Sequence, residues 1–144
     1  MSLRALPVTV IPFFLYFVFV MIGLHDGAAA VGDGWASLSG EKGWTMMSGG
    51  TWKLTWGDVL LMVTLICLFV EILKATYTTT ASLVDHGLSM VLFIAGLIAF
   101  LMVPQAATSV FFLLLVALVI DVVAGFTIGI RVAKRDIGFG SGDQ

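Results

Sequence analysis

Uninterrupted apolar sequence is the feature that most constrains what this chain can fold into. The run from Val110 to Ile120 contains no polar residue, and 60% of the 144 residues are apolar while only 11% are charged. A soluble domain of this length could not present such a composition to water. A helix needs about 20 mostly apolar residues to cross about 30 Å of hydrocarbon. Four stretches can be drawn to that length, at 6–24, 58–78, 84–103 and 109–130.

Backbone hydrogen bonding decides the class of fold. Within hydrocarbon every N–H and C=O group needs a partner inside the protein, which leaves helices or closed barrels. The apolar runs lack the alternation of barrel strands, so we predict an all-α membrane protein. Short connections at 76–80 and 104–108 make successive helices antiparallel neighbours, which indicates a four-transmembrane-helix up-down bundle forming a single membrane domain over 1–144.

Two features at the ends of the apolar stretches refine this picture. The first stretch resembles a secretory signal, because Arg4 precedes the apolar run and the alanines at 28–30 follow it. We expect this stretch to be retained as a membrane anchor. Thr55-x-x-Asp58 and Ser82-x-x-Asp85 are both typical of a capping box, which predicts helix starts before the second and third stretches.

Basic residues predict the orientation. Lysine and arginine in short loops are retained on the cytoplasmic side of a membrane. Arg4 precedes the first stretch, Lys74 lies at the end of the second, and the tail at 131–144 carries Arg131, Lys134 and Arg135. We therefore expect a multi-pass protein of a bacterial-type inner membrane, with both termini cytoplasmic and the segment 25–57 as an extracytoplasmic loop.

The predicted extracytoplasmic loop is rich in glycine and tryptophan. The alternation at 51–56 suits a short extended run, so we expect a small hairpin or an irregular cap on the membrane surface. Indole rings favour the headgroup region, so an interfacial belt is the simpler account of the tryptophans. A partner-docking surface is the alternative, since tryptophan is enriched in binding hot spots. The four residues are Trp35, Trp44, Trp52 and Trp56.

Ionisable residues occur inside the apolar stretches, where each costs about 2.5 to 3.5 kcal/mol on insertion. At 1.5 Å per residue, Glu71 and Asp121 lie about 20 Å and about 18 Å from the outer ends of their helices, and the others lie deeper on the cytoplasmic side. Simple structural accounts exist: Asp85 as a capping residue and Glu71 with Lys74 as an i,i+3 ion pair. The predicted intramembrane polar cluster consists of Glu71, Lys74, Asp85, His86 and Asp121.

Spacing predicts which way these side chains face. Small residues recur every four positions with Asp121, at Ala117, Gly125 and Gly129, and such a face lets helices approach closely. Asp121 is therefore expected to face protein rather than lipid. In the second stretch a similar small and polar stripe is formed by Thr64, Cys67, Glu71, Ala75 and Thr78. We expect the two stripes to face each other or a second copy of the chain.

These features exclude several classes of function. The net charge of −2 offers no basic face for nucleic acid. A single cysteine forms no intrachain disulfide, and no catalytic set, metal-ligand spacing or phosphate loop is evident, so we expect neither an enzyme nor a metal site. The expected partners are membrane lipid and other membrane protein subunits, with a homo-oligomer as an alternative.

Three functional hypotheses remain open. The first is a non-catalytic accessory or assembly subunit of a larger respiratory, photosynthetic or transport complex. The second is a small homo-oligomeric proton- or cation-coupled transporter or channel that uses Asp121 and Glu71, with His86 and Asp85 as a relay. The third and weaker one is a quinone- or lipid-binding protein. No resident cofactor is expected beyond such a bound lipid or quinone.

Overall fold

The computed structural model describes residues 7–25, 34–40, 43–76 and 80–138, and for 80–83 and 132–138 it describes the backbone only. These residues are mostly helical and include four α-helices. The predicted positions Arg4, Thr78 and 139–144 lie outside the described residues. The elements, in chain order, are α1 (Val10–Met21), β1 (Trp44–Thr45), β2 (Thr51–Trp52), α2 (Trp56–Ala75), α3 (Thr80–Met102), the 3-10 helix η2 (Pro104–Ala106) and α4 (Ser109–Gly138).

Three of the helices are long and apolar enough to cross a membrane. Their spanning segments are Trp56–Ala75, Val84–Met102 and Ser109–Arg131. The first predicted span, 6–24, contains only the 12-residue helix α1, which rises about 18 Å and is too short to cross about 30 Å of hydrocarbon as a regular helix. A bundle of four full spans is therefore not confirmed.

Local backbone chemistry explains why α1 is short. The turn at Pro7–Thr9 precedes the helix, with the Val10 N–H donating to the Pro7 carbonyl, and Pro12 supplies no N–H. At the other end Gly23 has a φ of +77°, a left-handed conformation that stops helices and favours glycine. The Gly23 N–H donates to the carbonyl of Val20, and Leu24 to that of Phe19. Both ends of α1 are thus set by proline and glycine.

The other helices also depart from their predicted limits. Helix α3 begins at Thr80 rather than near 84, and α2 ends at Ala75 rather than 78. Helix α4 has 30 residues and continues beyond the predicted end of the span at 130 to Gly138. The predicted start of α2 is confirmed, because Thr55 and Asp58 form a complete capping box.

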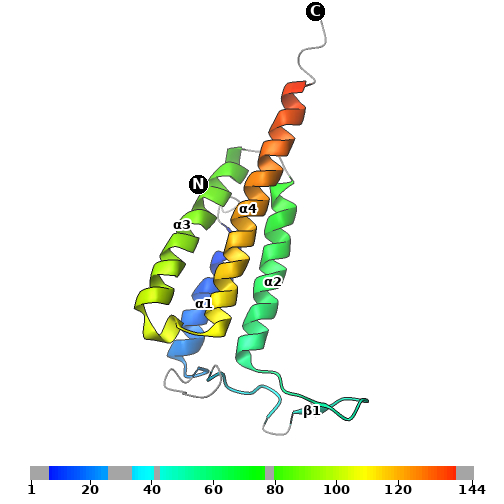
Figure 1. Ribbon diagram of the computed structural model, residues 1–144, viewed down its shortest axis with the longest axis vertical. Helices are drawn as coiled ribbons and strands as arrows, with labels where there is room; N and C mark the ends of the chain where they lie inside the picture. The colour runs from blue at the N-terminus through cyan, green and yellow to red at the C-terminus, as the bar shows by residue number, and fades with distance from the viewer. Residues whose placement is uncertain (1–6, 26–33, 41–42, 77–79, 139–144) are drawn as a thin grey trace, which may run out of the picture.

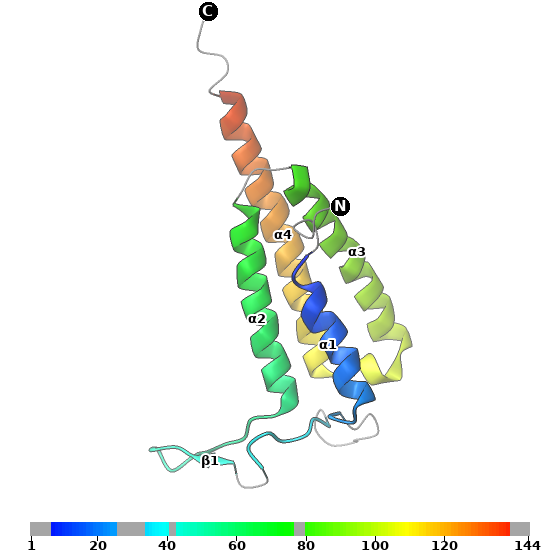
Figure 2. The ribbon, with the colours of Figure 1, turned by 180° about the vertical axis from the view of Figure 1, so that it is seen from behind.

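Helix α4 is the central element, packed against both α2 and α3 (Figure 1). Helix α1 lies behind α4 in Figure 1 and in front of it in the reversed view, where it covers only the half of the bundle that carries the connection from α1 to α2 (Figure 2). We call this the loop end, and the opposite end, where α2 connects to α3, the tail end. The loop-end half contains the apolar core, whose larger buried members are Tyr16, Leu60, Phe111, Leu114, Leu115 and Leu118.

A strap and a hairpin form the loop end. Residues 34–40 run between the exit of α1 and the entry of α2, with the Ala36 N–H donating to the Leu24 carbonyl and the Trp56 N–H to the Ala36 carbonyl. Strands β1 and β2 then pair antiparallel, Trp44 opposite Trp52, and the hairpin projects beyond α2 (Figure 1). The predicted hairpin is confirmed. The strand within 51–56 is Thr51–Trp52, and it pairs with Trp44–Thr45.

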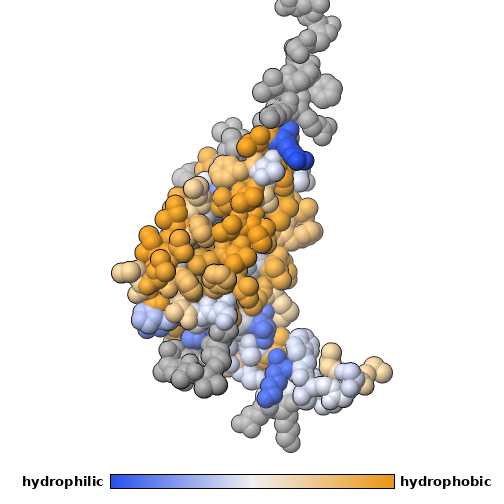
Figure 3. Space-filling model, in the orientation of Figure 1, coloured by the Kyte–Doolittle hydropathy of each residue, from blue (hydrophilic) through white to orange (hydrophobic). Residues whose placement is uncertain are grey.

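An apolar band covers the helices in the space-filling view, and polar surface gathers at the two ends (Figure 3). The exposed side chains of α2, α3 and α4 include Ile66, Phe69, Val91, Ile98 and Val123. A soluble protein would not expose so much contiguous apolar surface, so this band is suited to hydrocarbon. The fold is that of a membrane-embedded helical protein.

Candidate functional site

The described intramembrane polar residues lie together in the tail-end half. Each of the three spanning helices contributes, and the N-terminal end of α1 adds Thr9. Apart from Lys74, whose side chain is 30% exposed, these residues are buried. We call this set the polar cluster and define it as Thr9, Glu71, Lys74, Asp85, His86, Ser89 and Asp121.

Lys74 joins α2 to α3 within the polar cluster. Its Nζ lies 3.1 Å from Oε1 of Glu71, as the predicted i,i+3 pair requires, and 2.7 Å from Oδ2 of Asp85. Asp85 does not cap α3, because the helix begins five residues earlier and places this carboxylate in the second turn. The capping interpretation of Asp85 is therefore wrong. A buried interhelical ion pair takes its place.

The turn before α1 is fixed by the same cluster. The Val8 N–H donates to Oε2 of Glu71 at 3.0 Å, and the Thr9 hydroxyl donates to Oδ2 of Asp121 at 3.2 Å. Glu71 and Asp121 thereby hold the start of α1 at their own depth, about 18 Å along α4 from Ser109.

Gly125 brings α3 close to α4. A Cβ atom at this glycine would collide with Nδ1 of His86, so the imidazole occupies the space that any side chain at 125 would need. The same ring has Nδ1 at 3.8 Å from Oδ1 of Asp121, one helical turn away. Asp121 and Gly125 of the predicted small face are thus turned toward His86 of α3, whereas Ala117 is buried beside Thr64 of α2 and Gly129 is half-buried.

Several polar atoms of the cluster lack a hydrogen-bond partner among the described residues. They include Oδ1 of Asp85, Oδ1 of Asp121 and the Ser89 hydroxyl, which lies near the Asp121 carboxylate without reaching hydrogen-bond geometry. Three carboxyl groups in the cluster face one lysine and one histidine. The described part of the chain offers no group of three His, Cys, Asp or Glu side chains arranged to hold a metal ion.

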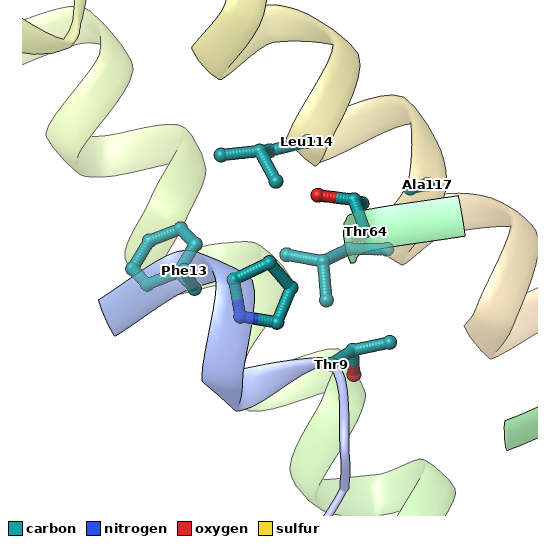
Figure 4. A pocket seen from close by; sticks show the side chains of 7 residues that line it. Thr9, Phe13, Thr64, Leu114 and Ala117 are labelled. Carbon is teal, nitrogen blue, oxygen red and sulfur yellow. The ribbon is translucent and has the colours of Figure 1, made fainter. Parts of the chain in front are cut away.

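The polar cluster is closed toward the loop end. In Figure 4, Thr9 and Phe13 from the α1 segment face Thr64, Leu114 and Ala117 across a gap. This gap is too narrow to hold a water molecule. Beyond it, Tyr16 is fully buried and donates to the Gln105 carbonyl at 2.6 Å, which anchors α1 to η2. Side chains of the apolar core therefore separate the cluster from the loop end.

A groove between α2 and α4 opens on the face opposite α1. Its volume is about 220 Å³, and its lining exposes almost only apolar atoms. The one hydroxyl there, that of Thr64, donates to the Leu60 carbonyl at 2.7 Å and so has no need of a ligand. The groove suits hydrocarbon. Its lining is formed by Leu61, Thr64, Leu65, Leu68, Leu113, Val116, Ala117 and Ile120.

The four predicted docking tryptophans fall into two pairs. Trp35 packs on Tyr16 with ring centroids 5.5 Å apart, and Trp56 packs on Phe19 at 5.6 Å, so both rings fill the end of the bundle. Trp44 and Trp52 pack on each other at 5.6 Å and remain about half exposed on the hairpin. Of the four, only this second pair offers a surface that projects from the molecule.

Two members of the polar cluster were not predicted from the sequence. Thr9 gives a weak signal, a hydroxyl between two prolines at the start of an apolar run, and Ser89 lies one turn after Asp85 and His86 on α3. The spacing of Ser89 from Asp85 and His86 would have revealed that it belongs to the cluster. Thr9 reaches Asp121 because α1 begins only at Val10, later than the predicted start of the first span at 6. Comparisons with protein-family models, with curated proteins and with solved structures found no match for this chain.

Proposed function

We propose that this chain is a non-catalytic accessory or assembly subunit that docks onto a helix of a larger membrane complex. The observation that carries the proposal is the apolar groove between α2 and α4, together with the exposed hairpin that projects beyond α2. Thr64 and Ala117 give the groove small side chains, and small residues allow close helix packing in hydrocarbon. The expected occupant is an apolar transmembrane helix of the partner.

The hairpin supplies a second contact for the same partner. Trp44 and Trp52 are 48% and 49% exposed, and Met47 at the turn is fully exposed. Aromatic and methionine side chains are enriched in protein interfaces. A partner helix seated between α2 and α4 would emerge from the membrane beside this hairpin, so the groove and the hairpin are expected to bind one polypeptide.

The proposal includes a topology. We place the protein in a bacterial-type inner membrane with the loop end outside and the tail end in the cytoplasm. Lys74 and Arg131 lie toward the tail end, in keeping with the retention of basic residues on the cytoplasmic side. Helix α1 is proposed to form the fourth membrane-embedded helix, with both chain termini cytoplasmic.

Conduction by Asp121 is the less favoured alternative. A transporter needs the charged site to be reachable from both faces of the membrane, but the cluster is separated from the loop end by the core around Tyr16, Phe111 and Leu114. Asp121 is 1% exposed and hydrogen-bonded within its own chain. A ring of identical chains around this carboxylate would require the contact with Thr9 to break.

Photocrosslinking in the native membrane tests the docking proposal. The photoreactive residue p-benzoylphenylalanine replaces Leu65 or Val116 in the groove, or Met47 on the hairpin, one position at a time. Val91 and Ile98 on the exposed face of α3 serve as matched controls, being similarly apolar and exposed. We expect all three test positions to yield an adduct with the same partner polypeptide, identified by mass spectrometry, and both control positions to yield lipid adducts only.

Other outcomes reject the proposal. Lipid adducts alone at Leu65 and Val116 would assign the groove to acyl chains rather than to a partner helix. An adduct between two copies of this chain at the same positions would indicate a homo-oligomer instead of an accessory subunit.

A further inference from the structure

The groove between α2 and α4 has a small floor and large walls. Its floor is formed by Thr64 of α2 and Ala117 of α4, whose exposed fractions are only 3% and 6%. Both residues also line the narrow gap that faces α1, so they separate that gap from the groove (Figure 4). Larger apolar side chains from both helices form the walls, and those exposed at the surface are Leu65, Leu113, Val116 and Ile120.

The two helices present this groove in register. Both α2 and α4 begin at the loop end, so they run parallel to each other (Figure 1). Thr64 and Ala117 are each the ninth residue of their helix, at a depth of about 12 Å from the loop end. The same i, i+3, i+4, i+7 spacing, which places side chains on one face of a helix, occurs in both linings. These linings lie at 61, 64, 65 and 68 in α2 and at 113, 116, 117 and 120 in α4.

The dimensions of the groove determine which part of a partner helix reaches its floor. From residue 61 to residue 68 the groove is about 10 Å long, so its volume of about 220 Å³ gives a mean cross-section of about 20 Å². A helix with its side chains is about 10–12 Å in diameter, which is far too wide to enter. A side chain does fit, because a protein cavity of about 150 Å³ already accommodates a benzene ring. The groove therefore has room for one large apolar side chain, such as leucine or phenylalanine.

We infer, on the basis of the proposed docking function, that the partner helix inserts one large apolar side chain between these walls onto Thr64 and Ala117. A partner face made only of small residues would leave the space above this floor unfilled, and an unfilled space forfeits packing contacts. Packing is the main source of helix association in hydrocarbon. The matched spacing on two parallel helices favours a knob-into-hole contact, with the partner helix crossing α2 and α4 at about 20°.

The depth of the floor predicts where the partner carries this side chain. A partner helix that lies along the groove passes Thr64 and Ala117 about 12 Å from the loop end. If its membrane span begins level with α2 and α4, this distance corresponds to about eight residues from the loop-end boundary of the span. The expected partner sequence therefore has leucine, phenylalanine or a side chain of similar size within one turn of that position.

Crosslink mapping and a matched pair of alanine variants test the inserted side chain. With p-benzoylphenylalanine at Leu65 or Val116, tandem mass spectrometry locates the partner residue that forms the adduct, which we expect within one turn of a large apolar residue at the predicted depth. Ala117→Leu fills the floor and is expected to lower the amount of partner that copurifies in mild detergent at least about fivefold, because it overpacks the contact. Ala95→Leu adds the same bulk to the exposed surface of α3 and is expected to leave copurification unchanged.

The outcomes distinguish the inserted side chain from docking itself. If Leu65 and Val116 yield no adduct with any partner polypeptide, docking fails and the inserted side chain fails with it. Adducts that map to a partner face of glycine, alanine and serine leave docking intact but overturn the inserted side chain, and misfolding of Ala117→Leu cannot conceal this result because the floor is then unaltered. Undiminished copurification with a folded Ala117→Leu protein, or an equal loss with Ala95→Leu, overturns it as well.

Discussion

The absence of a side chain at Gly125 determines how closely α3 approaches α4. The His86 ring occupies the position of the missing side chain and thereby reaches Asp121 on the preceding turn. Gly87 lies next to His86 on α3, but a Cβ atom there would meet nothing within 4 Å. The two glycines share a membrane environment and the same helix-propensity cost, so they form a matched pair for measuring the contact.

Gly125→Ala is predicted to destabilise the protein by about 1–3 kcal/mol, the usual cost of overpacking a close contact. The added methyl group would displace the imidazole from Asp121. Gly87→Ala adds the same methyl group in open space and is predicted to be neutral or stabilising by up to about 1 kcal/mol, because alanine favours helix. Reversible unfolding in mixed detergent micelles measures both. Equal effects of the two substitutions would mean that the contact with His86 contributes nothing.

Lys74 is the residue on which charge compensation between α2 and α3 depends. Lys74→Met is predicted to destabilise the protein by about 3 kcal/mol, since it leaves Glu71 and Asp85 facing each other without a cation. The double variant Lys74→Met with Asp85→Asn is predicted to recover part of this loss, because one uncompensated charge is removed. The same unfolding assay applies, with Lys53→Met on the exposed hairpin as the control. A loss no larger than that control would contradict the prediction.

The individual contacts show how far sequence reasoning reaches. The buried stripe of Thr64, Cys67 and Glu71 follows from helical periodicity, and so does the burial of Asp121 with Ala117 and Gly125. The partner of Asp85 did not follow, because a capping box and an interhelical ion pair use the same residue types. The contact between Gly125 and His86 depends on how two helices are rotated about their axes, which spacing within one helix cannot determine.

At the scale of elements, the helices differ in what sets their length. Helices α2 and α4 follow their apolar sequence, and α4 continues past it to Gly138. Helix α1 instead ends where proline and glycine require, although apolar residues extend on both sides. Its start coincides with Glu71 and Asp121, whose carboxylates accept hydrogen bonds from Val8 and Thr9. Hydropathy alone therefore overestimates the first span, whose limits depend on tertiary partners.

The hairpin is a separate element whose geometry depends on Gly43. This residue has a φ of +69°, and a Cβ atom there would lie 2.7 Å from the Trp52 carbonyl oxygen. Gly40 has a similar φ of +74° but open space around it, so alanine at either position meets the same backbone strain. Only at Gly43 would alanine also push the two strands apart.

Gly43→Ala is therefore predicted to open the hairpin, and Gly40→Ala to leave it paired. Tryptic cleavage after Lys53, which follows β2, reports the opening, because proteases need an unpaired chain. We expect several-fold faster cleavage in Gly43→Ala than in Gly40→Ala, with no difference in the unfolding of the helical bundle. Equal cleavage rates would show that strand pairing tolerates a side chain at 43.

The whole molecule is polarised along its long axis. The loop-end half contains an apolar core with aromatic rings, whereas the tail-end half contains every ionisable side chain that the described spanning segments bury. The groove between α2 and α4 opens sideways on the face away from α1. The groove and the polar cluster therefore share no residue.

The proposed orientation of this polarised molecule is open to a direct test. Cys67 is the only cysteine and is 7% exposed, so the Cys67→Ala variant provides a background without thiols. In that background, Met47→Cys on the exposed hairpin is predicted to react with a membrane-impermeant maleimide in intact cells, whereas Ser141→Cys in the C-terminal segment is predicted to react only after the membrane is permeabilised. We expect this result because basic residues are retained in the cytoplasm, which places the tail end inside the cell and the hairpin outside it. Labelling of Ser141→Cys alone in intact cells would reverse the orientation and place the polar cluster on the outer side of the membrane.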